Sequence, residues 1–263
     1  MHQIITPFFR LDTQAREAAD FYGHIFGATT VDANPMVTEI DIRWYCVCLM
    51  NWWKHFVPNP SISLSVRCAD HDRTRSIRDQ LIVWGSILMD FGVYPWSSAY
   101  GWCNDRFGIS WQIMLTDRDI VIPSIWFTYD CESAIALYTS IFELSHIDIV
   151  HKETNNIVSH AEFTLHDQKF IAMDIWHEHK FSLNEWVSLL VRCDDQEQVD
   201  YYRDRLTSIE SQCWRLKDKF GVSWQIIPKQ LTQALFDPDQ TKATYAMNAM
   251  MKMQKIIIKD LYM

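Results

Sequence analysis

Residues 105–113 read D-R-F-G-I-S-W-Q-I, and residues 218–226 read D-K-F-G-V-S-W-Q-I, 113 positions later. A second segment returns upstream in the same order. Ser63–Cys68 (S-L-S-V-R-C) is repeated at Ser188–Cys193 (S-L-L-V-R-C). A repeat of this length exceeds the 20–50 residues of a solenoid unit and indicates a duplicated domain.

The duplication predicts the domain organisation. The Phe21-Tyr22 and Ile25-Phe26 pattern of the first copy returns as Leu137-Tyr138 and Ile141-Phe142. The chain of 263 residues also suits two domains of ordinary size. We therefore expect module one at residues 1–117, module two at 118–230 and a helical tail at 231–263.

Hydrophobic periodicity predicts an α+β fold built from four β-α-β-β-β units. Module two repeats the pattern of module one, and the tail is predicted to form helices at Leu231–Phe236 and Asp239–Leu261 with methionines that pack. The elements predicted for module one are strands at Ile4–Leu11, Glu39–Cys48, Ser61–Cys68, Ser97–Trp102 and Gly108–Leu115, a helix from Ala15 to Phe26 that Gly27 ends, and a helix marked by Ile77, Leu81 and Trp84.

Composition excludes several classes of protein. Lysine and arginine number 24 against 33 acidic residues, a net charge of −9, which disfavours a nucleic-acid surface. No two of the seven glycines lie two residues apart, so no G-x-G or P-loop can cradle a phosphate group. The seven cysteines form no C-x-x-C pair, and neither a signal peptide nor an apolar run of membrane-spanning length is present. We expect reduced thiols and a cytoplasmic protein.

Several segments together resemble one family. I-T-P-F-F-R-L-D and A-D-F-Y-x-x-I-F in module one, with S-L-L-V-R-C-D-D, D-K-F-G-V-S-W-Q-I-I-P and F-D-P-D-Q-T-K-A in module two and the tail, are similar to PhnB-like proteins. These belong to the vicinal-oxygen-chelate superfamily, with glyoxalase I, bleomycin-resistance proteins and extradiol dioxygenases. The resemblance covers nearly the whole chain. Such domains often carry the label 3-demethylubiquinone-9 3-methyltransferase, but nothing in this sequence resembles a methyl-donor site.

The resemblance implies curved mixed sheets with helices outside. Each sheet would line a cup, where catalytic relatives hold a divalent metal. The ligands there come from the first strand, from the strand that opens the second half and from the last strand. The matching residues in modules one and two are Thr6 and Ile122, Ser63 and Ser188, and Gln112 and Gln225. None of these is an imidazole, carboxylate or thiolate, so we expect no metal at either position. Gln112 and Gln225 are ligand-binding candidates. An equal alternative is that their side-chain amides form hydrogen bonds only with residues of the neighbouring strands.

Other residues are candidates outside these positions. A new metal site, if one exists, would use His160, Glu162, Asp174, His177 and His179. Arg10 and its equivalent Trp126 occupy matching first-strand positions, and a buried arginine there requires an anion, supplied by a ligand or by Glu39 or Asp41. Seven tryptophans are expected near sheet edges and cup mouths, where an aromatic pocket would suit flat apolar ligands, although core packing explains most of the tryptophans: Trp44, Trp52, Trp53, Trp96, Trp102, Trp176 and Trp214. Among them, Trp102 and Trp214 are the ligand-binding candidates.

The expected function is metal-free binding of a small organic ligand in a sheet-lined cup, with no cofactor. Two alternatives stay open. The chain could be a metal-dependent lyase, isomerase or dioxygenase of the same superfamily, or one module could be purely structural, as a built-in dimer partner. The expected assembly is a monomer with an intramolecular pseudo-dimer, or a homodimer.

Overall fold

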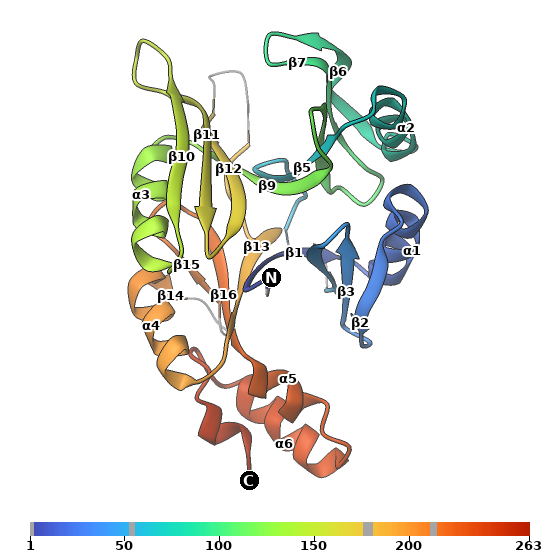
Figure 1. Ribbon diagram of the computed structural model, residues 1–263. Coiled ribbons are helices and arrows are strands. Elements are labelled where there is room, and N and C mark those ends of the chain that lie inside the picture. Colours follow the sequence, from blue (N-terminus) through green and yellow to red (C-terminus); the bar gives the residue numbers. More distant parts are fainter. Residues whose placement is uncertain (1–2, 53–55, 176–180, 211–214) are drawn as a thin grey trace. The chain divides into compact units, whose positions relative to one another are not determined.

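The computed structural model describes residues 3–52, 56–175, 181–210 and 215–263 (Figure 1). Chain contacts divide it into a large unit, Pro7–Val187, and a small unit, which contains the chain up to Thr6 and Ser188–Met263. The elements in chain order are β1 (Ile5–Leu11), α1 (Ala15–Phe26), β2 (Thr29–Ala33), β3 (Val37–Ile42), β4 (Tyr45–Asn51), β5 (Ile62–Cys68), α2 (His71–Leu81), β6 (Ser86–Tyr94), β7 (Ser97–Asn104), β8 (Ser110–Leu115), β9 (Ile120–Phe127), α3 (Cys131–Ile141), β10 (His146–Lys152), β11 (Val158–Leu165), β12 (Gln168–Asp174), β13 (Val187–Cys193), α4 (Gln196–Leu206), β14 (Ile209–Glu210), β15 (Arg215–Lys217), β16 (Ser223–Pro228), α5 (Lys229–Leu235), α6 (Gln240–Met250) and the 3-10 helix Ile258–Leu261.

An eight-stranded mixed sheet runs through the large unit in the order β10-β11-β12-β9-β5-β8-β7-β6. Each half is one β-α-β-β-β unit, in which the first strand lies parallel to the last: β5 beside β8, and β9 beside β12. The halves join where β5 and β9 pair antiparallel, with Ser63 opposite Ser124. The second half of the first sequence repeat and the first half of the second therefore share one sheet, which confirms the predicted α+β units.

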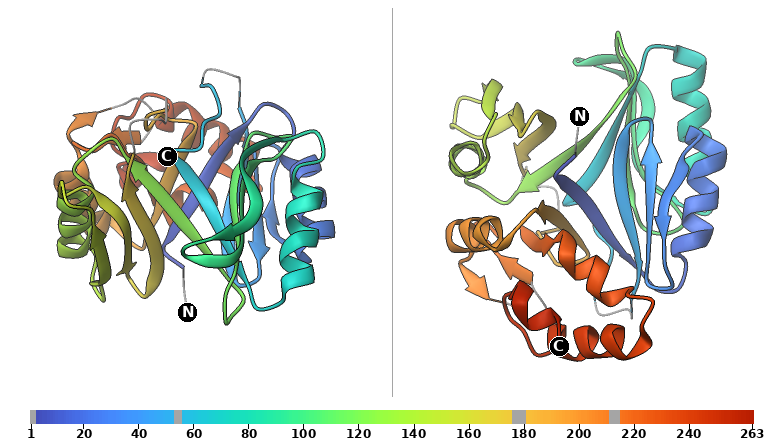
Figure 2. Two further views of the ribbon diagram at one scale, coloured as in Figure 1. Left: turned by 90° about the horizontal axis from the view of Figure 1, so that it is seen from above. Right: turned by 60° about the horizontal axis from the view of Figure 1, so that its bottom comes forward.

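Three helices cover the strands of the large unit. α1 packs against β3 and β4, α2 packs against β7 and β8, and the two helices lie side by side (Figure 2). α3 packs against β10, β11 and β12 (Figure 1). The buried face of α1 consists of Ala15, Ala18, Ala19, Tyr22 and Phe26, as helical spacing predicts, and Gly27 ends the helix in the left-handed conformation.

Some predicted boundaries are wrong. The strand expected at Glu39–Cys48 is two strands, β3 and β4, joined by a turn in which Arg43 and Trp44 both have positive φ. Trp84 lies beyond the end of α2 and is 85% exposed, so it does not contribute to the buried face of that helix. The edge strands β2, β6 and β10 were not predicted. Their side chains are largely exposed, which removes the apolar alternation that marks a half-buried strand.

The small unit contains the last β-strands and the tail. β13 pairs parallel with β16, and β15 pairs antiparallel with β16. The tail helix predicted over Asp239–Leu261 ends at Met250 instead, because the chain turns there and brings Ile256 and Leu261 back against α5 and α6. Met250 is buried in this cluster, and Met247 and Met253 pack against it, which confirms the predicted packing role.

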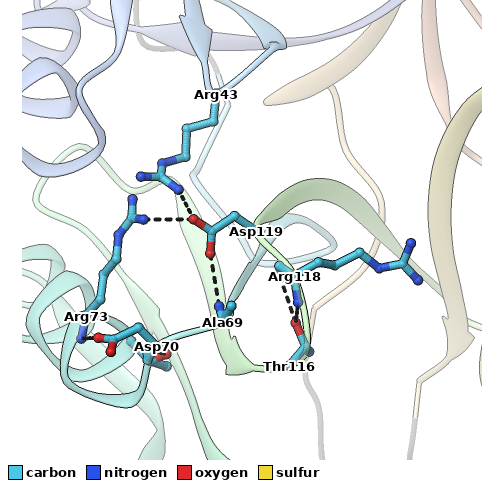
Figure 3. Close-up of polar contacts among 8 residues, drawn as sticks. Arg43, Ala69, Asp70, Arg73, Thr116, Arg118 and Asp119 are labelled. Carbon is cyan, nitrogen blue, oxygen red and sulfur yellow. Dashed lines mark hydrogen bonds and ion pairs between the residues drawn. The ribbon is translucent and has the colours of Figure 1, made fainter.

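An ionic contact ties the β3–β4 turn of the large unit to α2. Asp119, just before β9, accepts hydrogen bonds from Arg43 and, at 2.8 Å, from Arg73 (Figure 3). Its second oxygen accepts from the backbone N–H of Ala69 at 3.0 Å. The hydrogen bond from Ala69, followed by the contact with Arg43, holds the pKa of Asp119 below its ordinary value.

No helix in the described part of the chain is both long and apolar enough to cross a lipid bilayer. The cysteines described there are free thiols, and all except Cys46 are buried. This agrees with the expected reduced, packed cysteines.

Candidate functional site

The predicted position on the last strand of module one is a closed hydrogen-bond network. Gln112 on β8 donates from Nε2 to the Ser63 hydroxyl on β5 at 2.8 Å and to the Ser124 hydroxyl on β9 at 3.2 Å. Its Oε1 accepts from the Tyr100 hydroxyl at 3.1 Å. All four side chains are buried. The amide of Gln112 is therefore satisfied by neighbouring strands, the alternative that the sequence left open.

Aromatic side chains fill the same face of the sheet. The rings of Trp102 and Trp126 stack with centroids 4.9 Å apart and planes inclined by 8°, and Phe181 meets both edge-on. Trp102 donates from its indole to the Ser110 hydroxyl at 2.8 Å. Ile122 belongs to the same buried cluster. The predicted residues Trp102 and Trp126 thus come together, but they pack against each other.

The small unit carries the equivalent set. Gln225 on β16 donates from Nε2 to the Ser188 hydroxyl at 2.5 Å, and both side chains are buried. Thr6, the matching first-strand residue of this unit, is also buried, and its hydroxyl has no hydrogen-bond partner. Trp214 lies outside the described residues.

The residues at these positions do not fit a divalent metal. Zinc and the other divalent transition metals are held in proteins mainly by carboxylates, thiolates and imidazoles, which offer a charge or a strong lone pair. Ser63, Gln112 and Ser124 offer neutral oxygen and nitrogen atoms that already bond to one another. Binding a cation here would break this buried network and gain no charged ligand.

The alternative metal residues are divided between two faces of one sheet. His160 Nε2 lies 3.3 Å from Glu162 Oε1, and Glu162 also bonds to Arg67. The His160 hydrogen bond, followed by Arg67, lowers the pKa of Glu162 to about 2.

Asp174 lies on the opposite face of that sheet, because strand positions alternate and Glu162 is opposite Ile171. Its two oxygens accept from the backbone N–H groups of Cys131 and Val158, at 3.0 and 2.9 Å. His177 and His179 lie outside the described residues. Among the residues that the structure describes, no group of three His, Cys, Asp or Glu side chains could hold a metal ion.

Arg10, at the end of β1, is buried with a weakly paired guanidinium. Its side chain is 4% exposed, and Nη2 lies 3.8 Å from Glu185 Oε2, beyond hydrogen-bond distance. Nε and Nη2 have no hydrogen-bond partner, and the guanidinium lies over the Phe56 ring at 4.7 Å. Burial lowers the pKa of Arg10 to about 10, against the raising effect of Glu185. The paired carboxylate is Glu185, which sequence reasoning did not consider.

A pocket of about 390 Å³ lies beside Arg10 in the large unit. Trp186, also in its wall, has a buried indole N–H without a hydrogen-bond partner. Arg106 lines the pocket too, but it already pairs with Glu17 at 3.0 Å. The pocket wall also contains Trp52, Phe56, Trp84 and Phe107. Trp84 and Trp186 were not predicted here, since helical spacing assigned Trp84 to the second helix and no motif marks Trp186.

Another wall residue, Asp105, explains the sequence repeat. One carboxylate oxygen accepts from the backbone N–H groups of Phe107 and Ile109, at 2.9 and 3.0 Å. The other accepts from the Tyr22 hydroxyl at 2.6 Å and the Trp111 indole at 2.8 Å. Burial nevertheless raises the pKa of Asp105 to about 6, because it outweighs these four hydrogen bonds.

The second copy repeats this turn at Asp218, which accepts from the Trp224 indole at 2.8 Å. Gly108 and Gly221 have φ values of +86° and +93°, a conformation that favours glycine. The repeated spacing within the chain therefore encodes a turn. The presence of the aspartate in both copies was the available signal for its role.

Comparison with known proteins agrees with this architecture. A model of the 3-demethylubiquinone-9 3-methyltransferase family matches residues 3–114 and again 119–227. Glyoxalase I from Zea mays is similar in fold, with a TM-score of 0.56 at 10% identity over 90% of this chain and 98% of its own. A PhnB protein from Bacillus cereus is 28% identical over 43% of this chain and 100% of its own, with a TM-score of 0.39.

No curated protein matches the chain. The two family matches span most of the sequence, and the glyoxalase-like fold agrees with them. The chain therefore belongs to the 3-demethylubiquinone-9 3-methyltransferase family, whose domain it carries twice in tandem.

Proposed function

We propose that this protein binds a small organic anion, without a divalent metal, in the pocket beside Arg10. One observation carries the proposal: Arg10 is buried at the pocket wall, and the Nε and Nη2 atoms of its guanidinium have no hydrogen-bond partner. A buried charge is stable only when it is paired and hydrogen-bonded, and the carboxylate of Glu185 at 3.8 Å does not supply such a bond.

A ligand carboxylate would complete this arrangement. Guanidinium and carboxylate form short, charge-assisted hydrogen bonds, and the Trp186 indole is a further donor in the same wall. The volume of about 390 Å³ lies within the range of small-molecule sites. The positive charge of Arg10 and the aromatic side chains around it favour an organic anion. Of the two carboxylates in the same wall, Asp105 already accepts four hydrogen bonds and Asp12 is exposed to solvent.

The proposal includes no metal because the inherited metal positions carry serine hydroxyls and glutamine amides that bond to each other. The stacked Trp102 and Trp126 occupy the face of the sheet beside Gln112. We therefore assign the ligand to the Arg10 pocket and give the Gln112 network a structural role.

The test is isothermal titration calorimetry in EDTA with two carboxylate probes, 2-naphthoate and decahydro-2-naphthoate. Arg10→Met keeps most of the side-chain length and removes the charge. A lost charge-assisted hydrogen bond corresponds to about 1.5–3 kcal/mol, so affinity for both probes should fall by about 10- to 100-fold. Arg10→Lys keeps the charge and should retain part of the affinity.

Arg67→Met is the matched control, since Arg67 is also largely buried in the large unit but pairs with Glu162 on the sheet face. It should leave the affinity unchanged. The proposal is wrong if wild-type protein binds neither probe, or if Arg10→Met binds as well as wild type. Binding that requires added Zn²⁺ or Mn²⁺ and disappears in EDTA would instead support the metal-dependent alternative.

A further inference from the structure

Trp84 is an exposed tryptophan at the rim of the Arg10 pocket. It follows the C-terminus of α2, its side chain is 85% exposed, and it lines the pocket. A tryptophan with this exposure packs on little of its own protein. Its indole face is therefore available to another molecule.

The backbone of Trp84 is unusual for such a residue. Its φ is +62°, in the left-handed region where glycine is favoured and a bulky side chain is strained. Helices commonly end with glycine in this conformation. Burial of the ring does not offset this strain, because the side chain is 85% exposed.

The next residue fixes where the Trp84 turn lies. A Cβ added to Gly85 would be 2.2 Å from the carbonyl oxygen of Asn104, so the chain can approach the β7–β8 turn this closely only as glycine. Gly85 also donates its backbone N–H to Ile82 at 2.9 Å. Asn104 and Phe107, from the β7–β8 turn, line the same pocket. The turn is thus fixed against the pocket wall.

We propose that Trp84 is a stacking platform that selects anions carrying a flat aromatic ring. This inference rests on the proposed function, since Arg10 would hold the carboxylate. An aromatic ring stacks on an indole face, whereas a saturated ring of similar size gains only ordinary van der Waals contact. The chemical class of ligand is therefore an aromatic carboxylate.

The same two probes test the inference. 2-Naphthoate and decahydro-2-naphthoate have the same carboxylate and carbon skeleton, but only the first is flat and aromatic. Trp84→Gly should weaken binding of 2-naphthoate about tenfold and binding of decahydro-2-naphthoate, which loses only van der Waals contact, by less than about threefold. Because glycine relieves the left-handed strain, the variant should melt at the same temperature as wild type or higher. Trp84→Phe keeps a ring and should retain affinity for 2-naphthoate within about threefold.

Trp44→Gly is the matched control. Trp44 is 90% exposed and has a φ of +68°, but it lies in the β3–β4 turn and not in the pocket wall. This variant should bind both probes as wild type does. Equal weakening of both probes by Trp84→Gly, or no weakening of either, would overturn the stacking role while the Arg10 variants still test the anion site. If wild-type protein binds neither probe, the anion site is refuted and the inference with it.

Discussion

Asp105→Asn tests how a buried carboxylate controls the stability of the large unit. The carboxylate accepts four hydrogen bonds, yet burial raises its pKa from 3.8 to about 6. A raised pKa means that the folded state binds the proton more tightly than the unfolded state. The stabilising contribution of the protonated group is therefore complete below pH 3.8 and is lost as the pH rises through 6.

The size of this effect follows from the shift. Each pKa unit corresponds to about 1.4 kcal/mol, so ionisation of Asp105 lowers the free energy of unfolding by about 3 kcal/mol. The amide side chain that replaces the carboxyl group cannot ionise, so the variant lacks this component. The substitution also weakens the acceptor of the Trp111 indole N–H, which lowers the stability of the variant by about 1–3 kcal/mol at every pH.

The assay is urea unfolding, followed by circular dichroism, of both proteins from pH 4 to pH 7. The stability advantage of wild type over Asp105→Asn should shrink by about 2 kcal/mol across this range, because the unfolded carboxyl group is already partly ionised at pH 4. Tyr22→Phe removes a hydrogen bond that lowers the pKa of Asp105, so it should move the transition to higher pH. Parallel stability curves for wild type and Asp105→Asn would refute the reasoning.

Three further variants test the packing and hydrogen bonding around the sites. Gln112→Leu leaves the hydroxyls of Ser63, Ser124 and Tyr100 without their partner, so the free energy of unfolding should fall by about 3 kcal/mol. The control in urea unfolding is Gln80→Leu, at an exposed position. If both variants lose the same amount of stability, the buried hydrogen-bond network does not stabilise the fold. Gly85→Ala places a Cβ 2.2 Å from the Asn104 carbonyl oxygen and should lower the free energy of unfolding by about 3 kcal/mol. In the control variant Gly92→Ala the added Cβ meets no atom within 4 Å, so the free energy of unfolding should change by less than about 1 kcal/mol. Similar melting temperatures for the two variants would rule out the close approach of Gly85 to Asn104. Asp119→Asn weakens the contact to Arg43 and Arg73, and should destabilise the protein by about 1 kcal/mol at pH 7. Because the pKa of Asp119 is lowered in the folded state, this difference should shrink as the pH falls below 3.8 and the folded carboxylate becomes protonated. A difference that stays constant as the pH is lowered would contradict the ionic origin.

The sequence by itself determined the family and the local units. The repeated turn needs an aspartate and a glycine at fixed spacing, since Asp105 binds two backbone N–H groups and Gly108 adopts positive φ. The spacing of apolar residues predicted α1 correctly, because burial of one helical face is a local pattern. The sequence also shows that Ser63 and Gln112 carry neither an imidazole, a carboxylate nor a thiolate, since this depends only on residue identity.

The edge strands could not be predicted from local sequence patterns. β6 and β10 have no buried face of their own, and backbone hydrogen bonds to a neighbouring strand hold them in the sheet. Backbone pairing of this kind does not require alternating apolar and polar residues along the strand. Trp84 was misplaced for a related reason, since an apolar residue one turn past Leu81 looks like a continuation of the helix.

Tertiary structure alone decided the candidate site. The antiparallel pairing of β5 with β9 brought Ser63, Gln112 and Ser124 together from both repeats. The pocket beside Arg10 is built from segments as far apart as β1 and Trp186, and the carboxylate near Arg10 is Glu185, 175 positions along the chain. Contacts between residues so far apart in the chain depend on how whole strands and helices pack, so local sequence patterns cannot predict them.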